Sequence, residues 1–259
     1  IFTLFEWFRG IIFTGFPWLS LGYSQIPNGP LAGYVSIVGV YGITFLILLS
    51  ITITLRIFKK IYSRESIWLG LFLVLIWGSG ELLKNVSWVN KINSPLKVSL
   101  IQGNISQDKK WDSKFLNESL IKYMKLIKSS SASLIVLPET SIPLMLHQIP
   151  NNYLNEIRSH AIKNDGDVIL GVIEKENEEF YNSAISIGTA PMQRYRKFHL
   201  VPFGEFIPFN KIIGYIYKNW LDIPFSDLSR GLEIQPPIVL SGQRLGLNIC
   251  YEDVFGYEI

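Results

Sequence analysis

Two long apolar runs dominate the first third of the chain. The first, Leu31 to Leu55, reads LAGYVSIVGVYGITFLILLSITITL and contains no charged residue. The second runs from Ser66 to Gly80, and Leu82 and Leu83 extend it. A helix needs roughly 20 apolar residues to cross the hydrocarbon core of a membrane. The pattern therefore predicts two spanning helices, over about 31–55 and 66–83. For the first run, the alternative is a buried helix of a soluble protein.

The segment before the first run mixes aromatic residues with Glu6, Arg9 and three prolines. This mixture predicts a broken or partial span, or a loop in the headgroup region, rather than a clean crossing. Trp7, Trp18 and Tyr23 suit a membrane interface, where aromatic side chains collect. They are interpreted either as interfacial anchors or as part of the lining of a lipid entrance.

Basic residues gather between the two apolar runs. They are Arg56, Lys59, Lys60 and Arg64, and only Glu65 opposes them. Loops rich in Lys and Arg stay on the cytoplasmic side of a membrane. We therefore expect this loop to be cytoplasmic, and everything after about Asn85 to be extracytoplasmic.

From Leu96 onward, short apolar runs alternate with helical patterns, which is typical of a layered α/β domain. Strands are expected in KVSLIQGNI, SLIVLPE, DVILGVIEK, FYNSAISIG and RLGLNICYE, and helices over Lys110–Ser130, Asn151–Asp165 and Lys211–Trp220. Glu139 and Cys250 both fall at the carboxyl ends of predicted strands, where α/β folds place their sites.

Composition excludes several classes of function. The formal net charge is only +3 and no long basic run occurs, so nucleic acid is not expected as a partner. A single cysteine excludes an intrachain disulfide and a multi-thiolate metal site. His147, His160 and His199 lack ligand spacing, and no P-loop or dinucleotide fingerprint occurs. We therefore expect no metal and no cofactor.

The remaining chemistry centres on Cys250. A lone cysteine at the end of an apolar strand is most often a small core residue, but a polar Tyr-Glu-Asp sequence follows this one. A thiol with a pKa near 8.5 needs a base or a nearby cation to act as a nucleophile. Glu139 can supply the base. Lys197 can supply positive charge, either to favour the thiolate or to stabilise an oxyanion.

Each of these residues also has a simpler interpretation. Glu139 suits a solvated loop after a strand, and Lys197 suits a surface cation. Glu205 either holds Lys197 by a charge-assisted contact or lies in an exposed turn. A Cys250–His199 dyad is a further alternative, supported neither by residue order nor by a motif.

The order Glu139 in PE, Lys197 before LVPFGE, and Cys250 in CYE resembles the nitrilase-like carbon–nitrogen hydrolase superfamily. Longer strings are similar to the apolipoprotein N-acyltransferase family, namely EWFRGIIFTGFPWLSLGYSQ, PLAGYVSIVGVYGITF, QGNISQDKKWD, KFHLVPFGEFIPF and NICYEDVFG. The resemblance extends from about Phe5 to Tyr257. One departure is Ser106, where relatives often have proline.

The resemblance implies an α/β fold in two parts. A transmembrane helical region over residues 1–84 would precede a nitrilase-like α-β-β-α sandwich over residues 85–259. By this likeness the chain is a fragment that lacks early spans and the final strands of the sandwich.

The resemblance also implies a role for seven residues: Cys250 as nucleophile, Glu139 as general base, Lys197 as transition-state stabiliser, Glu205 and Glu252 as supporting acids, Tyr251 as a backbone donor to the oxyanion, and Trp111 as a loop aromatic tied to activity. The expected reaction is ping-pong. Cys250 takes an acyl chain from a phospholipid, and the thioester then acylates the N-terminal amine of a diacylglyceryl-cysteine on an apolipoprotein.

The implied location is the bacterial inner membrane, with several spans, a periplasmic catalytic domain and a monomeric state. Two other hypotheses stay open. One is a membrane-tethered nitrilase or amidase that uses water as acceptor, and the other is a non-enzymatic polytopic subunit. The second predicts that loss of the thiol at Cys250 changes nothing.

Overall fold

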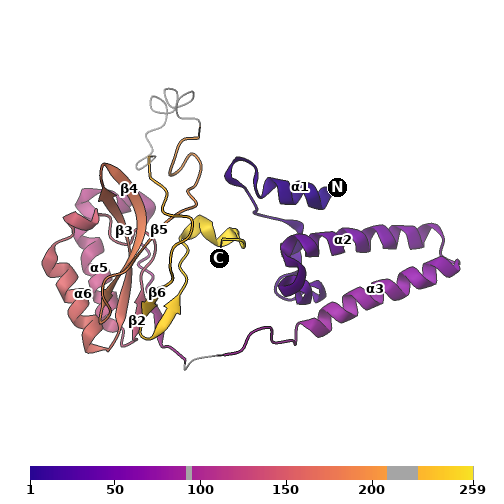
Figure 1. Cartoon of the computed structure of the whole chain (residues 1–259), viewed down its shortest axis with the longest axis horizontal. Helices are drawn as coiled ribbons and strands as arrows, with labels where there is room; N and C mark the ends of the chain where they lie inside the picture. The colour runs from indigo at the N-terminus through magenta and orange to yellow at the C-terminus, as the bar shows by residue number, and fades with distance from the viewer. Residues whose placement is uncertain (92–94, 209–226, 259) are drawn as a thin grey trace. The chain divides into compact units, whose positions relative to one another are not determined.

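The computed structural model describes residues 1–91, 95–208 and 227–258 (Figure 1). The chain divides into a helical unit, Ile1–Asn93, and an α/β unit, Ser94–Ile259. The helix expected over Lys211–Trp220 lies outside the described residues.

Both long apolar runs form helices in the first unit. Helix α2 covers Val35–Lys59 and α3 covers Arg64–Leu83, and Ser63 caps α3 by accepting a hydrogen bond from the backbone of Ser66 at 3.1 Å. The segment before them contains α1, Phe2–Arg9, and short 3₁₀ helices at Ile12–Thr14, Leu21–Gln25 and Pro30–Tyr34.

The apolar side chains of α2 and α3 are mostly exposed within their own unit. Pro30–Lys59 and Arg64–Leu83 are long and apolar enough to cross a membrane. Large side chains such as Phe45, Trp68 and Val74 are more than half exposed. A helix that is apolar all round normally buries its surface in protein or lipid. The exposed apolar surface of these two helices therefore suits contact with lipid.

A buried carboxylate joins three segments of the helical unit. Glu6 on α1 accepts hydrogen bonds from the backbone of Leu21 and from the hydroxyl of Thr44 on α2, both at 2.8 Å. Since a buried charge is costly unless it is hydrogen-bonded, these contacts explain how an acid fits among apolar neighbours. Close packing joins the other end of the unit, where a Cβ on Gly33 would lie 1.9 Å from the carbonyl oxygen of Gly80.

The α/β unit is built on one five-stranded sheet in the order β1-β2-β3-β4-β5 (Figure 1). The strands are β1 Val98–Leu100, β2 Leu134–Val136, β3 Asp167–Glu176, β4 Glu179–Gly188 and β5 Arg194–Arg196. Pairing is parallel from β1 to β3 and antiparallel from β3 to β5. The tight β3–β4 turn uses Asn177 and Glu178, both at positive φ, as hairpin turns favour.

Layers cover both faces of this sheet. Helices α5, Leu116–Ser129, and α6, Asn151–Lys163, lie against one face (Figure 1). A separate hairpin, β6 Ile238–Leu240 and β7 Gln243–Leu245, packs against the other. Side chains alternate accordingly: Ile135, Val168, Leu170, Val172, Ile185 and Ile187 face the helices, whereas Leu134, Ile169 and Ala184 face the hairpin. The predicted α/β class is confirmed.

Two predicted boundaries were wrong. The helix expected from Lys110 begins only at Leu116, after the short helix α4, Gln107–Lys110, and a 3₁₀ turn at Ser113–Phe115. The Asp112 side chain accepts from the backbone of Lys114 at 2.9 Å, and this cap starts a new turn there.

The strand expected in RLGLNICYE ends at Leu245, and Cys250 instead begins a 3₁₀ helix, Cys250–Val254. The backbone N–H of Ile249 donates to the Glu252 side chain at 2.7 Å instead of to a neighbouring strand. Cys250 itself has φ 53, which is incompatible with a strand. A further 3₁₀ turn lies at Leu146–Gln148.

Candidate active site

Glu139 lies on a turn three residues beyond β2. The next residue, Thr140, has φ 42, a left-handed conformation that is unusual for a β-branched residue. Strand β3 approaches closely behind this turn, because a Cβ on Gly171 would lie 2.4 Å from the carbonyl oxygen of Pro138. The hydroxyl of Ser141 donates to the carbonyl of Gly171 at 3.2 Å. The turn is therefore tightly packed against the sheet.

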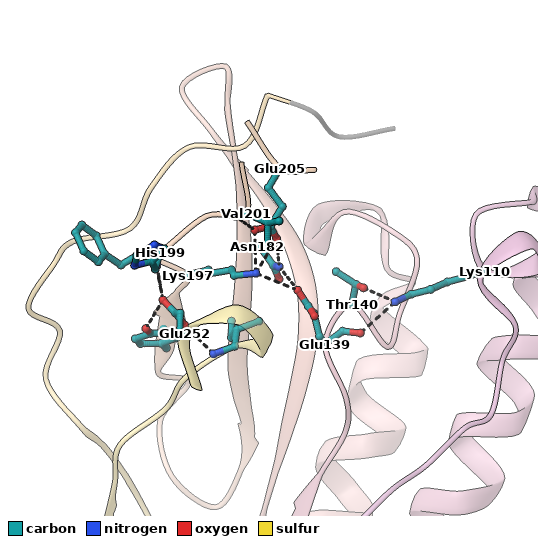
Figure 2. Close-up of polar contacts among 12 residues, drawn as sticks. Lys110, Glu139, Thr140, Asn182, Lys197, His199, Val201, Glu205 and Glu252 are labelled. Atoms are coloured by element: carbon teal, nitrogen blue, oxygen red, sulfur yellow. Dashed lines mark hydrogen bonds and ion pairs between the residues drawn. The ribbon is translucent and has the colours of Figure 1, made fainter. Parts of the chain in front are cut away.

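Lys197 lies just after β5, and its backbone N–H donates to the carbonyl of Asn182 on β4 at 2.8 Å. Only 1% of its side chain is exposed. Its ammonium lies 2.8 Å from Glu205 Oε2 and 3.7 Å from Glu139 Oε1 (Figure 2). A lysine this buried is stable as a cation only beside negative charge, and the two carboxylates supply it.

An amide bridges the two carboxylates. Asn182 Nδ2 donates to Glu139 Oε1 at 2.5 Å and to Glu205 Oε1 at 3.1 Å. Glu205 also accepts from the backbone of Val201 at 2.8 Å, so the LVPFGE loop folds back on itself. Sequence reasoning missed Asn182, although an amide inside the otherwise apolar strand FYNSAISIG was a signal that it has buried polar partners.

Cys250 completes this group. It is an exposed cysteine in the left-handed region, at φ 53, and strained residues of this kind collect at functional sites. Partial burial raises the pKa of the Cys250 thiol, and the charge of Glu139 and a hydrogen bond to it raise it further. The positive charge of Lys197 acts in the opposite direction. The thiol therefore lies within the influence of both residues with which it was predicted to work.

Glu252 connects the Cys250 turn to the Lys197 segment. Its carboxylate is buried and accepts hydrogen bonds from four donors: the hydroxyl of Tyr195 at 2.9 Å and the backbone N–H groups of Phe198 at 2.7 Å, His199 at 3.1 Å and Ile249 at 2.7 Å (Figure 2). Burial, together with the charge of Glu252, raises the pKa of the Tyr195 hydroxyl. Glu252 acts here as a scaffold and is turned away from solvent.

Replacing Glu252 by alanine is expected to destabilise the α/β unit. The change leaves four donors without their acceptor, and unpaired buried groups are costly. We expect the free energy of unfolding to fall by about 3–5 kcal/mol, because each buried donor left unpaired costs about 1–3 kcal/mol and some of the four can rebond to water. Thermal unfolding followed by circular dichroism measures this change. The control is Asp253→Ala, since Asp253 is exposed and bonds only Asn248 among the contacts described. Equal melting temperatures for the two variants would contradict the scaffold role.

The structure gives no support to a Cys250–His199 dyad. His199 Nδ1 lies 2.7 Å from Glu258 Oε1, and its ring stacks on Phe255 with centroids 3.8 Å apart. Its other nitrogen, Nε2, has no hydrogen-bond partner among the described residues. His199 therefore belongs to an aromatic cluster with Tyr251 and Phe255.

Two further residues singled out from the sequence lie near this group. Tyr251 is buried and contacts the rings of His199 and Phe255 edge-on. Trp111 follows α4, and the ammonium of Lys110 lies 5.6 Å from the centroid of its ring. Their roles, an oxyanion donor and an activity-linked aromatic, stay predictions.

A cavity of about 240 Å³ lies beside Glu139. Polar side chains from the loop after β1 and from α4 line it, among them Gln102, Asn104, Gln107 and Lys110. Within the part of the chain that the structure describes, no three His, Cys, Asp or Glu side chains are grouped to hold a metal ion. Glu139 thus lies 3.7 Å from the Lys197 ammonium and influences the Cys250 thiol, and a carboxylate, an ammonium and a thiol are a set suited to acyl transfer.

Comparison with known proteins agrees with this chemistry. Residues 97–259 match the family model described as carbon-nitrogen hydrolase. Residues 1–53 match the model described as apolipoprotein N-acyltransferase N-terminal domain. The two matches fall largely on the α/β unit and on the helical unit, respectively.

Curated relatives that share one name align with nearly the whole chain. Apolipoprotein N-acyltransferase of Nitrosomonas europaea is 44% identical over 100% of this chain and 52% of its own length. That of Chromobacterium violaceum is 39% identical over 98% of this chain and 49% of its own length. That of Haemophilus ducreyi is 35% identical over 100% of this chain and 52% of its own length. The chain thus spans about half the length of the curated relatives it matches.

Proposed function

Because the chain belongs to the carbon–nitrogen hydrolase family, we propose that it forms the catalytic part of a membrane-bound apolipoprotein N-acyltransferase. The match of its first residues to the N-terminal domain of those enzymes supports this proposal, as do the curated relatives. The observation that supports it most is that Glu139 lies 3.7 Å from the Lys197 ammonium and that both residues influence the Cys250 thiol.

The first half-reaction forms a thioester. Glu139 takes the proton of the Cys250 thiol, and the sulfur attacks the carbonyl carbon of a phospholipid ester. A tetrahedral oxyanion forms, which the nearby Lys197 ammonium stabilises. When the carbon–oxygen bond breaks, the proton on Glu139 passes to the departing alcohol, and lysophospholipid leaves.

The second half-reaction forms an amide. The neutral N-terminal amine of a diacylglyceryl-cysteine attacks the thioester carbonyl, and the carbon–sulfur bond breaks as the carbon–nitrogen bond forms. Glu139 accepts the proton that the amine loses and returns it to the Cys250 sulfur. One carboxylate thus serves as base and then as acid in each half. An amide is more stable than a thioester, so the transfer is downhill.

The buried ion pairs fit this division of labour. Glu205 lies closer to the Lys197 ammonium than Glu139 does, at 2.8 Å against 3.7 Å. Glu205 therefore holds the cation in place, and Glu139, with a third of its side chain exposed, stays accessible for proton transfer. All of these side chains come from one copy of the chain, so we propose that a monomer suffices.

The helical unit sets the proposed location. Basic residues gather where α2 meets α3, with Lys59 ending α2, Lys60 in the loop and Arg64 beginning α3, and they favour the cytoplasmic side. The α/β unit follows α3 and would lie on the periplasmic side of the inner membrane. A site close to the outer leaflet of that membrane meets two lipid-anchored substrates at high local concentration.

The function is tested with the gene product that carries this chain, in detergent with acyl-labelled phosphatidylethanolamine. Addition of a diacylglyceryl-cysteine peptide is expected to move the label onto the peptide in a hydroxylamine-resistant amide. An identical peptide with a blocked amino terminus is the control and should stay unlabelled. Release of labelled fatty acid at one rate, with or without the free-amine peptide, would contradict the proposal and indicate a hydrolase that transfers the acyl chain to water.

A further inference from the structure

Lys110, which sequence reasoning did not single out, contacts the turn that carries Glu139. Its ammonium donates to the carbonyl oxygen of Glu139 at 3.2 Å and to the hydroxyl of Thr140 (Figure 2). Lys110 is the last residue of α4, far from Glu139 in the sequence. These two bonds tie the segment before Trp111 to the turn after β2.

The turn is strained and needs support from outside. Thr140 has φ 42, and a left-handed β-branched residue costs of order 1–3 kcal/mol, so that it persists only where its surroundings fix it. On the sheet side, the close approach of Gly171 fixes the turn. On the opposite side, Lys110 bonds both ends of the Glu139–Thr140 step. Of these two supports, only Lys110 bonds both the carbonyl of Glu139 and the hydroxyl of Thr140.

The environment of Lys110 suits a structural clamp better than a surface charge. The residue is partly buried, and burial lowers the pKa of its ammonium while the charge of Glu139 raises it. Lys109, its neighbour, is exposed and instead lies over the ring of Phe115, 4.9 Å from the centroid. Because these two adjacent lysines have different surroundings, Lys109 can serve as the matched control for Lys110.

We propose that Lys110 is a positioning residue for Glu139: by bonding the Glu139 carbonyl and the Thr140 hydroxyl together, its ammonium holds the turn that aims the Glu139 carboxylate at Cys250. This proposal rests on the proposed function only in treating Glu139 as the base. The aiming itself is a property of the folded chain and can be measured without any lipid substrate.

The measurement is the rate of alkylation of Cys250 by iodoacetamide as a function of pH, quantified by mass spectrometry on the peptide that carries Cys250. Only the thiolate reacts, so the rate rises through the pKa of the thiol. The charge of Glu139 and its hydrogen bond raise that pKa. Glu139→Gln should therefore shift the midpoint to lower pH. Lys110→Met should shift it in the same direction by a smaller amount, because the carboxylate is no longer held against the sulfur.

The direction of the shift separates positioning from a direct effect of charge. If Lys110 acted on the thiol only as a nearby cation, its removal would raise the midpoint, and that result would overturn the proposal. An unchanged midpoint would overturn it as well. Lys109→Met should leave the profile as in the wild type, and Lys110→Arg, which keeps a donor and a charge, should restore most of it. In a Glu139→Gln background, Lys110→Met should add no further shift.

Two additions keep the result interpretable. Thr140→Val removes one of the two acceptors and should give a smaller shift in the same direction, even if Lys110→Met folds poorly. In the lipid assay, Lys110→Met should lower kcat about tenfold with little change in KM, as expected for a misplaced base. If the wild type transfers no acyl group, the proposed function fails, whereas the alkylation pattern still decides the role of Lys110.

Discussion

Replacing Cys250 by alanine is expected to abolish acyl transfer without unfolding the protein. The thiol is the atom that becomes acylated, so its loss removes the covalent route and should lower kcat by at least about 10⁴-fold. The residue is exposed, and no hydrogen bond that holds the fold depends on its side chain among the contacts described. Alanine also meets the same backbone strain at φ 53 as cysteine does.

Transfer of labelled acyl chain to the diacylglyceryl-cysteine peptide measures this effect, and the melting temperature checks the fold. Cys250→Ser is the companion variant. Its hydroxyl keeps the size of the thiol but is far harder to ionise, so a trace of activity at most is expected. Transfer by the alanine variant at a rate near that of the wild type would contradict the nucleophilic role. It would mean that the thiol of Cys250 takes no part in the reaction.

Replacing Glu139 by glutamine is expected to give two effects of opposite sign. Acyl transfer should fall by about 10²- to 10⁴-fold, the usual contribution of a general acid–base group. The Cys250 thiol should nevertheless become easier to ionise, because Glu139 raises its pKa by charge and by a hydrogen bond. The midpoint of alkylation against pH should therefore move to a lower value while turnover drops.

Glu156 provides a matched control for Glu139. It is a half-exposed glutamate on α6 that pairs with Lys128, and it is not among the groups that shift the thiol pKa. Glu156→Gln should change neither turnover nor the alkylation profile. If Glu139→Gln lowers turnover and raises the alkylation midpoint, Glu139 does not face the sulfur as described here. A glutamine variant at 139 with full turnover would remove it from the mechanism altogether.

The elements that were predicted well are those whose signal is local and repeated. Most of the run Leu31–Leu55 lies in α2, Val35–Lys59, because a long uncharged apolar segment has few alternatives to a helix. DVILGVIEK and FYNSAISIG form the β3–β4 hairpin, because two strand-like runs meet at a short turn. The turn after β2 also holds Glu139 where the strand-end rule placed it.

The elements that were missed depend on contacts between distant segments. The strand expected through Cys250 stops at Leu245, and the backbone N–H of Ile249 donates to the Glu252 side chain instead of to a strand. Nothing in the sequence shows that the carboxylate of Glu252, two residues after Cys250, will point into the protein. The same holds for Lys110, whose long side chain reaches a turn about thirty positions away. Asn182 gave a hint of buried partners, but its bridge between two carboxylates follows from the strand register.

Convergence at the site was predicted through a family resemblance and not through geometry. Residue patterns alone left Glu139 and Lys197 open to plain surface interpretations, and Cys250 open to a core interpretation. The structure places the ammonium of Lys197 3.7 Å from a Glu139 oxygen and puts the thiol under the influence of both. Their catalytic roles stay proposals that the variants above test.

The central claim is that a fatty acyl chain becomes bonded to the sulfur of Cys250 during turnover. The most direct measurement is peptide mass spectrometry after brief incubation with phospholipid of one known acyl length and no acceptor. We predict one hydroxylamine-sensitive acyl mass on the peptide that carries Cys250, and its disappearance when the free-amine peptide is added. An acyl group on any other residue, or an acyl mass on Cys250 that survives the acceptor, would contradict the account.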